Sequence, residues 1–284
     1  MVSIVKVRSP AVAGMFYESH PESLKRRIDW CFTHNLGPGS IPEVSDGPRS
    51  IVGLVCPHAG YMYSGPVAAW SYHALARDGK PECFVILGPN HTGVGAAVSI
   101  MTSGRWRTPL GDVEVDSDLA ESILKYAEVV EEDFYAHLSE HSIEVQLPFL
   151  QYLYGEVKFV PICMMLQNYD VASKVGQAIA RAAADRDVVV IASTDFTHYE
   201  PQQIALENDE AVIRRILELD PEGVFEEVYR RNVSMCGPGP VVSMLVACRQ
   251  LGASRALKLK YATSGDITGD YIAVVGYASI AIYR

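Results

Sequence analysis

Short apolar runs alternate along this chain with longer segments in which apolar residues recur every three to four positions. Continuous runs rich in Val and Ile predict buried strands, and the periodic segments predict amphipathic helices. The apolar runs fall at 51–56, 83–88, 96–101, 158–164 and 187–193. The periodic segments fall at 21–34, 66–77, 117–129, 142–155 and 170–185, with two or three further helices at 201–231 and 238–251.

This alternation predicts an α/β fold with a mostly parallel central sheet and helices on both of its faces. Residues 103–116 are typical of a hairpin, and the apolar segments 256–264 and 271–282 close the sheet as a pair that antiparallel pairing would also suit. We expect Pro148 to break or kink the helix predicted at 142–155, because proline cannot donate a backbone hydrogen bond.

Composition narrows the class of protein. The chain has 284 residues, of which 49% are hydrophobic, and it contains no repeat or convincing linker. We therefore expect a single domain over 1–284. The formal net charge of −10 repels phosphate backbones, which argues against nucleic acid as a partner.

The same composition bears on location. The first residues lack the long apolar core of a signal peptide, and the apolar stretch at 271–283 is too short to span a bilayer as a helix. We expect a soluble, cytoplasmic protein with no membrane contact. The cysteines are scattered without a CxxC pair, which is typical of reduced thiols; they lie at 31, 56, 83, 163, 236 and 248.

Three of the predicted core strands end in a loop that carries histidine. His58 follows 51–56, His91 follows 83–88, and Asp195 and His198 follow 187–193. The carboxyl ends of parallel strands meet at one edge of a sheet, where ligands of α/β proteins bind. The pattern therefore predicts one site built from all three loops, although a single histidine at a strand end is more often a structural residue.

Cys236 precedes Gly-Pro-Gly-Pro and an apolar helix. A thiol at the N-terminus of a helix is expected to have a lowered pKa, and a thiolate is a nucleophile or a metal ligand. Two neutral imidazoles and one thiolate suit zinc, copper or iron. The alternative is an inert cysteine of the core.

Other polar residues have two interpretations each. Asp195 and His198 could form a catalytic acid/base pair or a local turn. His137 and His141 are four residues apart, a weak metal signal without the glutamate of HExxH. Tyr61 and Tyr63 could line a pocket or simply pack.

Together these motifs resemble the Memo (mediator of cell motility) family, whose microbial members are also called AmmeMemoRadiSam system protein B. The matching stretches occur in order over nearly the whole chain: RSPAVAGMFY, PHAGYMYSG, LGPNHTG, WRTPLGDVEVD, EHSIEVQLPFL, STDFTHY, CGPGP and YATSGD.

The resemblance implies a fold like that of the class III extradiol dioxygenases, which are non-heme iron enzymes. It also implies a metal or ligand pocket formed by His58, His91 and Cys236, with Asp195 and His198 beside it. His141 is expected near the same pocket. Cys236 stands where the dioxygenases have a carboxylate, and this departure argues against ring cleavage.

Three functions remain open from the sequence. The first is a metal-dependent redox enzyme in which His58, His91 and Cys236 bind the metal and His198, oriented by Asp195, moves protons; the substrate would be a small molecule. The second is a metal-free hydrolase or transferase with Cys236 as nucleophile. The third is a non-catalytic module that binds a small molecule or a peptide, as the phosphotyrosine-type binding described for eukaryotic relatives implies. The family name further implies a radical-SAM protein as a functional neighbour.

Overall fold

A parallel five-strand array forms the centre of the sheet in residues 6–284, the part of the chain that the computed structural model describes. Neighbouring strands of this array all pair in parallel. In order across the sheet they are β6 (Gly111–Val115), β8 (Lys158–Met164), β3 (Cys83–Pro89), β9 (Val188–Ser193) and β2 (Ile51–Cys56). Every residue of β2, β3 and β9 is buried, as expected for strands covered on both faces.

Antiparallel strands complete the sheet. Next to β2 lies β12 (Val274–Tyr283), which pairs antiparallel with β2 and also with β11 (Arg255–Thr263) and the short β10 (His198–Glu200). The antiparallel arrangement of the closing pair is therefore confirmed. At the other edge, β5 (Arg105–Thr108) forms the predicted hairpin with β6. Three short strands lie at the same edge: β1 (Val7–Arg8), β4 (Val98–Ile100) and β7 (Glu131–Glu132).

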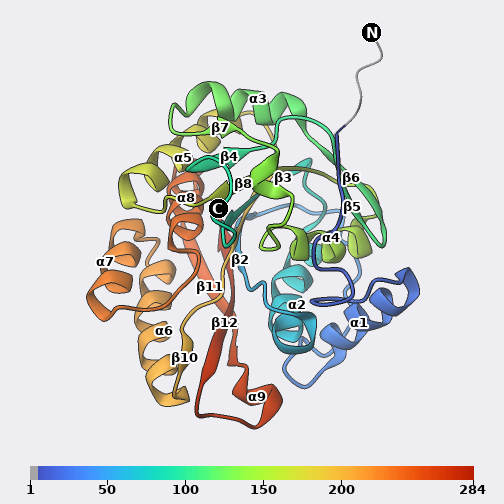
Figure 1. The fold of residues 1–284 in the computed structure, drawn as a ribbon, viewed down its shortest axis with the longest axis vertical. Helices are drawn as coiled ribbons and strands as arrows, with labels where there is room; N and C mark the ends of the chain where they lie inside the picture. Colours follow the sequence, from blue (N-terminus) through green and yellow to red (C-terminus); the bar gives the residue numbers. More distant parts are fainter. Residues whose placement is uncertain (1–5) are drawn as a thin grey trace.

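Helices cover the sheet on both faces (Figure 1). On one face α2 (Tyr61–Asp78) packs on β2 and β12, with α1 (Pro21–Thr33) and α4 (Leu147–Tyr154) beside it. On the other face α8 (Pro238–Gln250) packs on β9, β2 and β3 and against α5 (Tyr169–Ala182). The remaining helices lie around these: α3 (Ser117–Tyr126), α6 (Gln202–Leu217), α7 (Pro221–Arg231) and the short α9 (Gly265–Thr268). The predicted α/β fold class is confirmed.

Glycine allows the closest helix-to-sheet contact. A Cβ atom at Gly53 of β2 would lie 2.5 Å from Cys248 Sγ and 2.8 Å from Met244 Sδ, two side chains of α8. Such distances are well inside van der Waals contact, so α8 rests directly on the backbone of β2.

Two helix predictions need correction. The helix expected to begin at Pro66 begins at Tyr61, because Pro66 lies in the second turn and removes only one intrahelical hydrogen bond. The segment 142–155 is not one kinked helix. A 3-10 turn, Glu144–Gln146, leads into α4, and Pro148 occupies the first turn, where its missing N–H has no intrahelical partner to lose.

Within residues 6–284, no helix combines the length and the apolar composition that crossing a bilayer requires. The six cysteines are free thiols, and all but Cys236 are buried.

Candidate metal centre

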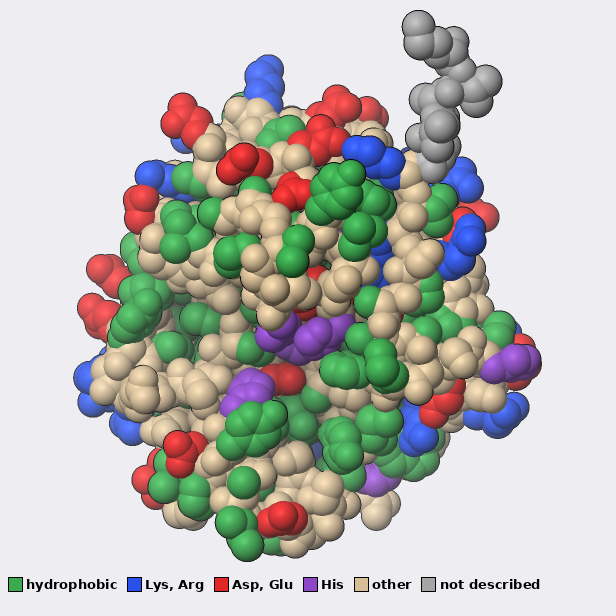
Figure 2. All heavy atoms as spheres, viewed as in Figure 1, with side chains coloured by type: hydrophobic (Ala, Val, Ile, Leu, Met, Phe, Trp, Pro, Cys, Tyr) green, Lys and Arg blue, Asp and Glu red, His purple; other side chains and the backbone are tan. Residues whose placement is uncertain are grey.

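The three histidine-bearing loops leave adjacent strands. β9 lies between β3 and β2, and all three strands run in parallel, so the loops that follow them emerge at the same edge of the sheet. Histidine side chains gather near the middle of the face shown in Figure 2, with an acidic side chain between them. The structure thus brings together residues that are far apart along the chain.

Three imidazoles form the core of the site. Ring nitrogens of His58, His91 and His141 lie within 4.8 Å of one another. The rings of His91 and His141 are stacked with centroids 4.6 Å apart, and the ring of His58 is nearly perpendicular to both. His58 is buried, His141 is half-buried and His91 is exposed, so the cluster has one side open to solvent.

Hydrogen bonds fix which nitrogen of His58 faces the cluster. The Ser193 hydroxyl donates to the Ser142 carbonyl at 2.6 Å and lies 2.9 Å from His58 Nδ1. A hydroxyl has one proton and a carbonyl can only accept, so Ser193 accepts from Nδ1–H of His58. Nε2 of His58 therefore carries the free lone pair. Burial is the main cause that lowers the pKa of His58, helped by His141 and His91, so the ring is neutral.

A buried carboxylate, Glu140, faces the other two histidines. Its Oε1 lies 3.0 Å from Nδ1 of His91 and 3.5 Å from Nδ1 of His141. Burial opposes ionisation of this group, but the hydrogen bonds from His91 and from the backbone N–H of Ser142 outweigh burial and lower the pKa of Glu140 to about 2. An ionised carboxylate only accepts hydrogen bonds, so Nδ1 of His91 is the donor and Nε2 of His91 is the nitrogen left for a ligand.

Cys236 lies beside the cluster, just before α8. Its Sγ is 3.3 Å from Nε2 of His58, and it accepts a hydrogen bond from the backbone N–H of Asp195 at 3.2 Å. Burial, reinforced by the Asp195 carboxylate, raises the pKa of the thiol. The lowered pKa expected from the helix N-terminus is therefore wrong for this state of the protein, because loss of hydration outweighs the helix dipole.

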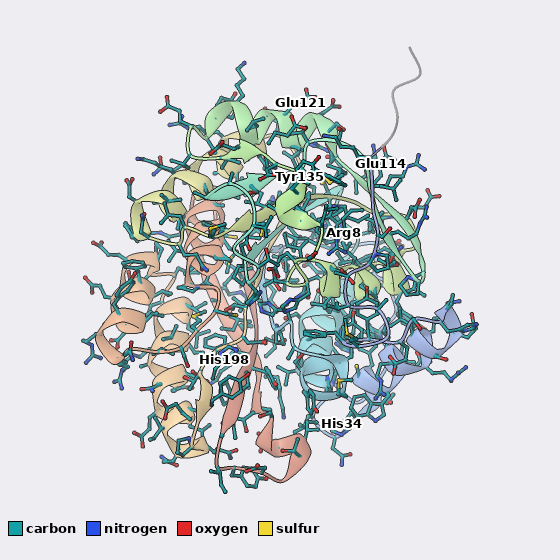
Figure 3. All side chains as sticks on the ribbon, in the orientation of Figure 1. Arg8, His34, Glu114, Glu121, Tyr135 and His198 are labelled. Atoms are coloured by element: carbon teal, nitrogen blue, oxygen red, sulfur yellow. The ribbon has the colours of Figure 1, made fainter. Side chains whose placement is uncertain are left out.

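Asp195 and His198, which were proposed as an acid/base pair, form hydrogen bonds with different partners. Oδ1 of Asp195 accepts the backbone N–H of His58 at 2.9 Å, and burial raises the pKa of this carboxyl to about 6. Nδ1 of His198 lies 2.8 Å from the Ser234 carbonyl and must donate to it. Among the described residues no hydrogen bond joins Asp195 to His198. Figure 3 labels His198, half-buried, on β10.

The tyrosines divide between core and surface. Tyr61 is 2% exposed, and its hydroxyl donates to the Val145 carbonyl at 2.6 Å. Its ring packs on Phe149 of α4 and on Tyr17. Tyr63 is 44% exposed. The aromatic side chain that packs against His141 is instead that of Phe16, whose ring centroid lies 4.7 Å from that of the imidazole.

Sequence reasoning did not identify the groups that hold the imidazoles in place. Glu140 and Ser193 are such groups, and so is Gln146, which donates from Nε2 to Ser193 at 2.7 Å. A local signal existed for Glu140, since it directly precedes His141. Its contact with His91, 49 positions away, is visible only in the fold.

His137, paired with His141 in the sequence pattern, does not reach the cluster. It ends a 3-10 turn, Tyr135–His137, so the two histidines do not share a helical face. Its ring packs against Trp106 with centroids 5.5 Å apart. Both of its ring nitrogens are buried, and neither has a hydrogen-bond partner within residues 6–284.

Comparison with known proteins agrees with the resemblance seen in the motifs. The family model described as Memo-like protein matches residues 8–281. The MEMO1 family protein MK0963 of Methanopyrus kandleri is 57% identical over 280 residues, covering 98% of this chain and 99% of that protein. The MEMO1 family protein MTH_45 of Methanothermobacter thermautotrophicus is 52% identical, covering 97% and 100%.

A solved structure is similar in fold alone. It is the crystal structure of the uncharacterized protein JW3007 from Escherichia coli K12, with a TM-score of 0.52 and 13% sequence identity, covering 82% of this chain and 99% of that one. The sequence relatives carry the assignment: the chain belongs to the Memo family.

Proposed function

We propose that this chain is a metal-dependent redox protein whose metal is held by His58 and His91, with His141 and Cys236 completing the set of donors. The observation that carries the proposal is the cluster of three imidazoles, in which Nδ1 of His58 and Nδ1 of His91 are hydrogen-bonded to oxygen acceptors and ring nitrogens of all three lie within 4.8 Å of one another. Hydrogen bonding of the outer nitrogen to carboxylate or other oxygen acceptors is the usual support of histidine ligands to metals.

The donor set suits a transition metal. Bond lengths of roughly 2.0 Å to nitrogen and 2.3 Å to sulfur place the two donor atoms of a tetrahedral site about 3.5 Å apart. The observed separation between His58 Nε2 and Cys236 Sγ is 3.3 Å. Imidazole with a soft thiolate favours copper, iron or zinc over magnesium or calcium.

The surroundings provide charge and proton exchange. Glu140 supplies a buried negative charge that favours a cation. Asp195, with a pKa of about 6, can take up and release a proton near neutral pH. Because Nδ1 of His198 donates to the Ser234 carbonyl, Nε2 is the nitrogen of this ring that can exchange a proton with a substrate. Bound copper or iron would supply one-electron redox chemistry for a small-molecule substrate.

Metal content after anaerobic purification tests this proposal. We expect stoichiometric copper, iron or zinc in the wild type and loss of metal in His58→Ala and Cys236→Ala. His20→Ala is the matched control, because His20 is exposed and its side chain forms no cap on α1. Equal, low metal in all four proteins would show that the assignment is wrong. Bound metal without turnover on a panel of redox substrates would favour a binding module.

One observation favours a second candidate, a thiol-dependent hydrolase. Cys236 Sγ and His58 Nε2 are close enough for the histidine to act as general base, and Ser193 orients the ring as a third group. A covalent acyl intermediate on Cys236 in protein treated with chelator would support this function. Loss of turnover on chelation without such an intermediate would support the metal centre.

A further inference from the structure

We infer that Glu140 is a positioning residue shared by two histidines of the centre: it holds His91 in the tautomer that presents Nε2 to a metal, and it holds the backbone of His141. This inference rests on the proposed function for its metal part only. Glu140 has 0% exposure. It belongs to the segment that leads to the 3-10 turn Glu144–Gln146, and its side chain contacts His91 in the loop that follows β3.

Both oxygens of the carboxylate contact His91. Oε1 lies 3.0 Å from Nδ1, and Oε2 accepts the backbone N–H of the same residue at 2.5 Å. Backbone and ring of His91 are thus held by one side chain 49 positions away. With the backbone of His91 held by Oε2 and its ring hydrogen-bonded at Nδ1 by Oε1, the side-chain torsions are restricted and Nε2 points in a fixed direction.

The same carboxylate organises the segment that carries His141. Oε1 accepts the backbone N–H groups of His141 and Ser142, each at 2.8 Å, and lies 3.5 Å from Nδ1 of His141. The backbone of Glu140 is itself held, because its carbonyl accepts Nη2 of the buried Arg8 at 2.6 Å. Figure 3 labels Arg8 near the middle of the molecule. Hydrogen bonds therefore fix both the side chain and the backbone of Glu140.

These contacts have two consequences for the histidines. The carboxylate accepts Nδ1–H of His91, so Nε2 is the nitrogen of that ring that faces away from the carboxylate and can bind a metal. Its negative charge also makes the rings stronger donors and offsets part of the charge of a cation. A glutamate that served only to close a turn would need neither the ring contacts nor the charge.

The tautomer can be measured without metal. In the metal-free wild type, long-range ¹H–¹⁵N spectra are expected to show His91 protonated at Nδ1. In Glu140→Ala the acceptor is gone, and we expect His91 to shift toward the Nε2–H form. The inference is overturned if wild-type His91 carries its proton on Nε2, or if Glu140→Ala leaves the tautomer unchanged.

Metal affinity tests the charge. We expect Glu140→Gln to bind Co²⁺, measured by chelator competition and by the visible spectrum of the bound ion, about 10- to 100-fold more weakly than the wild type. Glu22→Gln is the matched control, because Glu22 is exposed and pairs with Lys25 on the surface of α1; its affinity should be unchanged. Affinity of Glu140→Gln within twofold of wild type overturns the inference.

These outcomes separate the inference from the proposed function. If the wild type binds no Co²⁺, the metal centre fails, and the tautomer spectra still decide the role of Glu140. If Glu140→Ala does not fold, Glu140→Gln, which keeps the size and one acceptor oxygen, decides it by affinity.

Discussion

The Sγ atom of Cys236 lies 3.3 Å from Nε2 of His58, although the two residues are 178 positions apart in the sequence. Because Ser193 leaves Nε2 of His58 unprotonated, the thiol proton of Cys236 can lie between sulfur and nitrogen. A metal that binds both atoms would take the place of that proton.

We expect the thiol of Cys236 to react slowly with alkylating reagents in the metal-free protein. Burial and the Asp195 carboxylate raise the pKa of Cys236, so the thiolate is scarce at pH 7. We expect iodoacetamide to alkylate Cys236 at least about tenfold more slowly than free cysteine, since each unit of pKa above ambient pH lowers the thiolate fraction about tenfold. Peptide mass spectrometry over time gives the rate, with Cys236→Ser to identify the labelled peptide. Alkylation faster than free cysteine would contradict the raised pKa.

Ser193→Ala should weaken both stability and metal binding. The substitution removes the acceptor of His58 Nδ1–H and of Gln146 Nε2, so we expect a loss of about 1–3 kcal/mol in the free energy of unfolding and weaker Co²⁺ binding. The matched control is Ser243→Ala, because Ser243 is also buried and donates to a backbone carbonyl, that of Ala172. The control should lose stability alone. Unchanged Co²⁺ affinity in Ser193→Ala would show that the hydroxyl does not orient His58.

Glu144→Gln should be strongly destabilising. Glu144 has 0% exposure and pairs with the equally buried Arg8, and it also accepts the backbone N–H groups of Ala11 and Val12. Removing one partner of a buried ion pair costs about 3–5 kcal/mol. Denaturant unfolding measures the change, and hydrogen exchange of residues 9–17 should rise with it. The exposed Glu22→Gln is the control, expected within about 1 kcal/mol of the wild type. A small effect of Glu144→Gln would indicate that Arg8 finds another partner.

His137→Phe should reduce the sensitivity of the protein to acid. Burial lowers the pKa of His137 from its ordinary 6.5 to about 3, so the unfolded chain binds a proton that the folded protein refuses between these values. Stability from this residue is complete above pH 6.5 and is lost as pH falls toward 3. From pH 7 to pH 5 the loss amounts to about 2 kcal/mol.

Urea unfolding at pH 7 and pH 5 measures that difference. The wild type should lose about 2 kcal/mol more than His137→Phe over this interval, whatever the offset between the two proteins at pH 7. Because neither ring nitrogen of His137 has a partner, the phenyl ring breaks no side-chain hydrogen bond. Equal losses in the two proteins would mean that His137 binds a proton in the folded protein as readily as in the unfolded chain.

The centre of the sheet could be predicted because β2, β3 and β9 are buried along their whole length. Runs such as 51–56 and 83–88 contain almost no polar residues, and nothing but a covered strand suits them. The start of α2 could not be predicted as easily. Gly60 and Pro66 suggest a loop, yet the helix begins at Tyr61, whose ring packs on Phe149 and Tyr17. Tertiary packing there overrides the local preference.

The site was predictable where strand ends carry histidine, since parallel topology alone brings His58 and His91 to one edge. What surrounds them was not. Glu140 contacts His91 through a loop whose path depends on the whole fold, and the pKa of Cys236 depends on how deeply α8 is packed. The spacing of residues along the chain predicts neither the contact between Glu140 and His91 nor the pKa of Cys236.

The absence of a side chain at Gly53 reaches further than the packing of one helix. His58 continues from the strand that contains Gly53, and Cys236 precedes the helix that rests on it. The sulfur and the imidazole are therefore kept in register by contact deep in the interior, five residues before the histidine. A methyl group added at Gly53 would force the side chains of Cys248 and Met244 to move, and it would change the contact between the helix that follows Cys236 and the strand that leads to His58 without touching either donor.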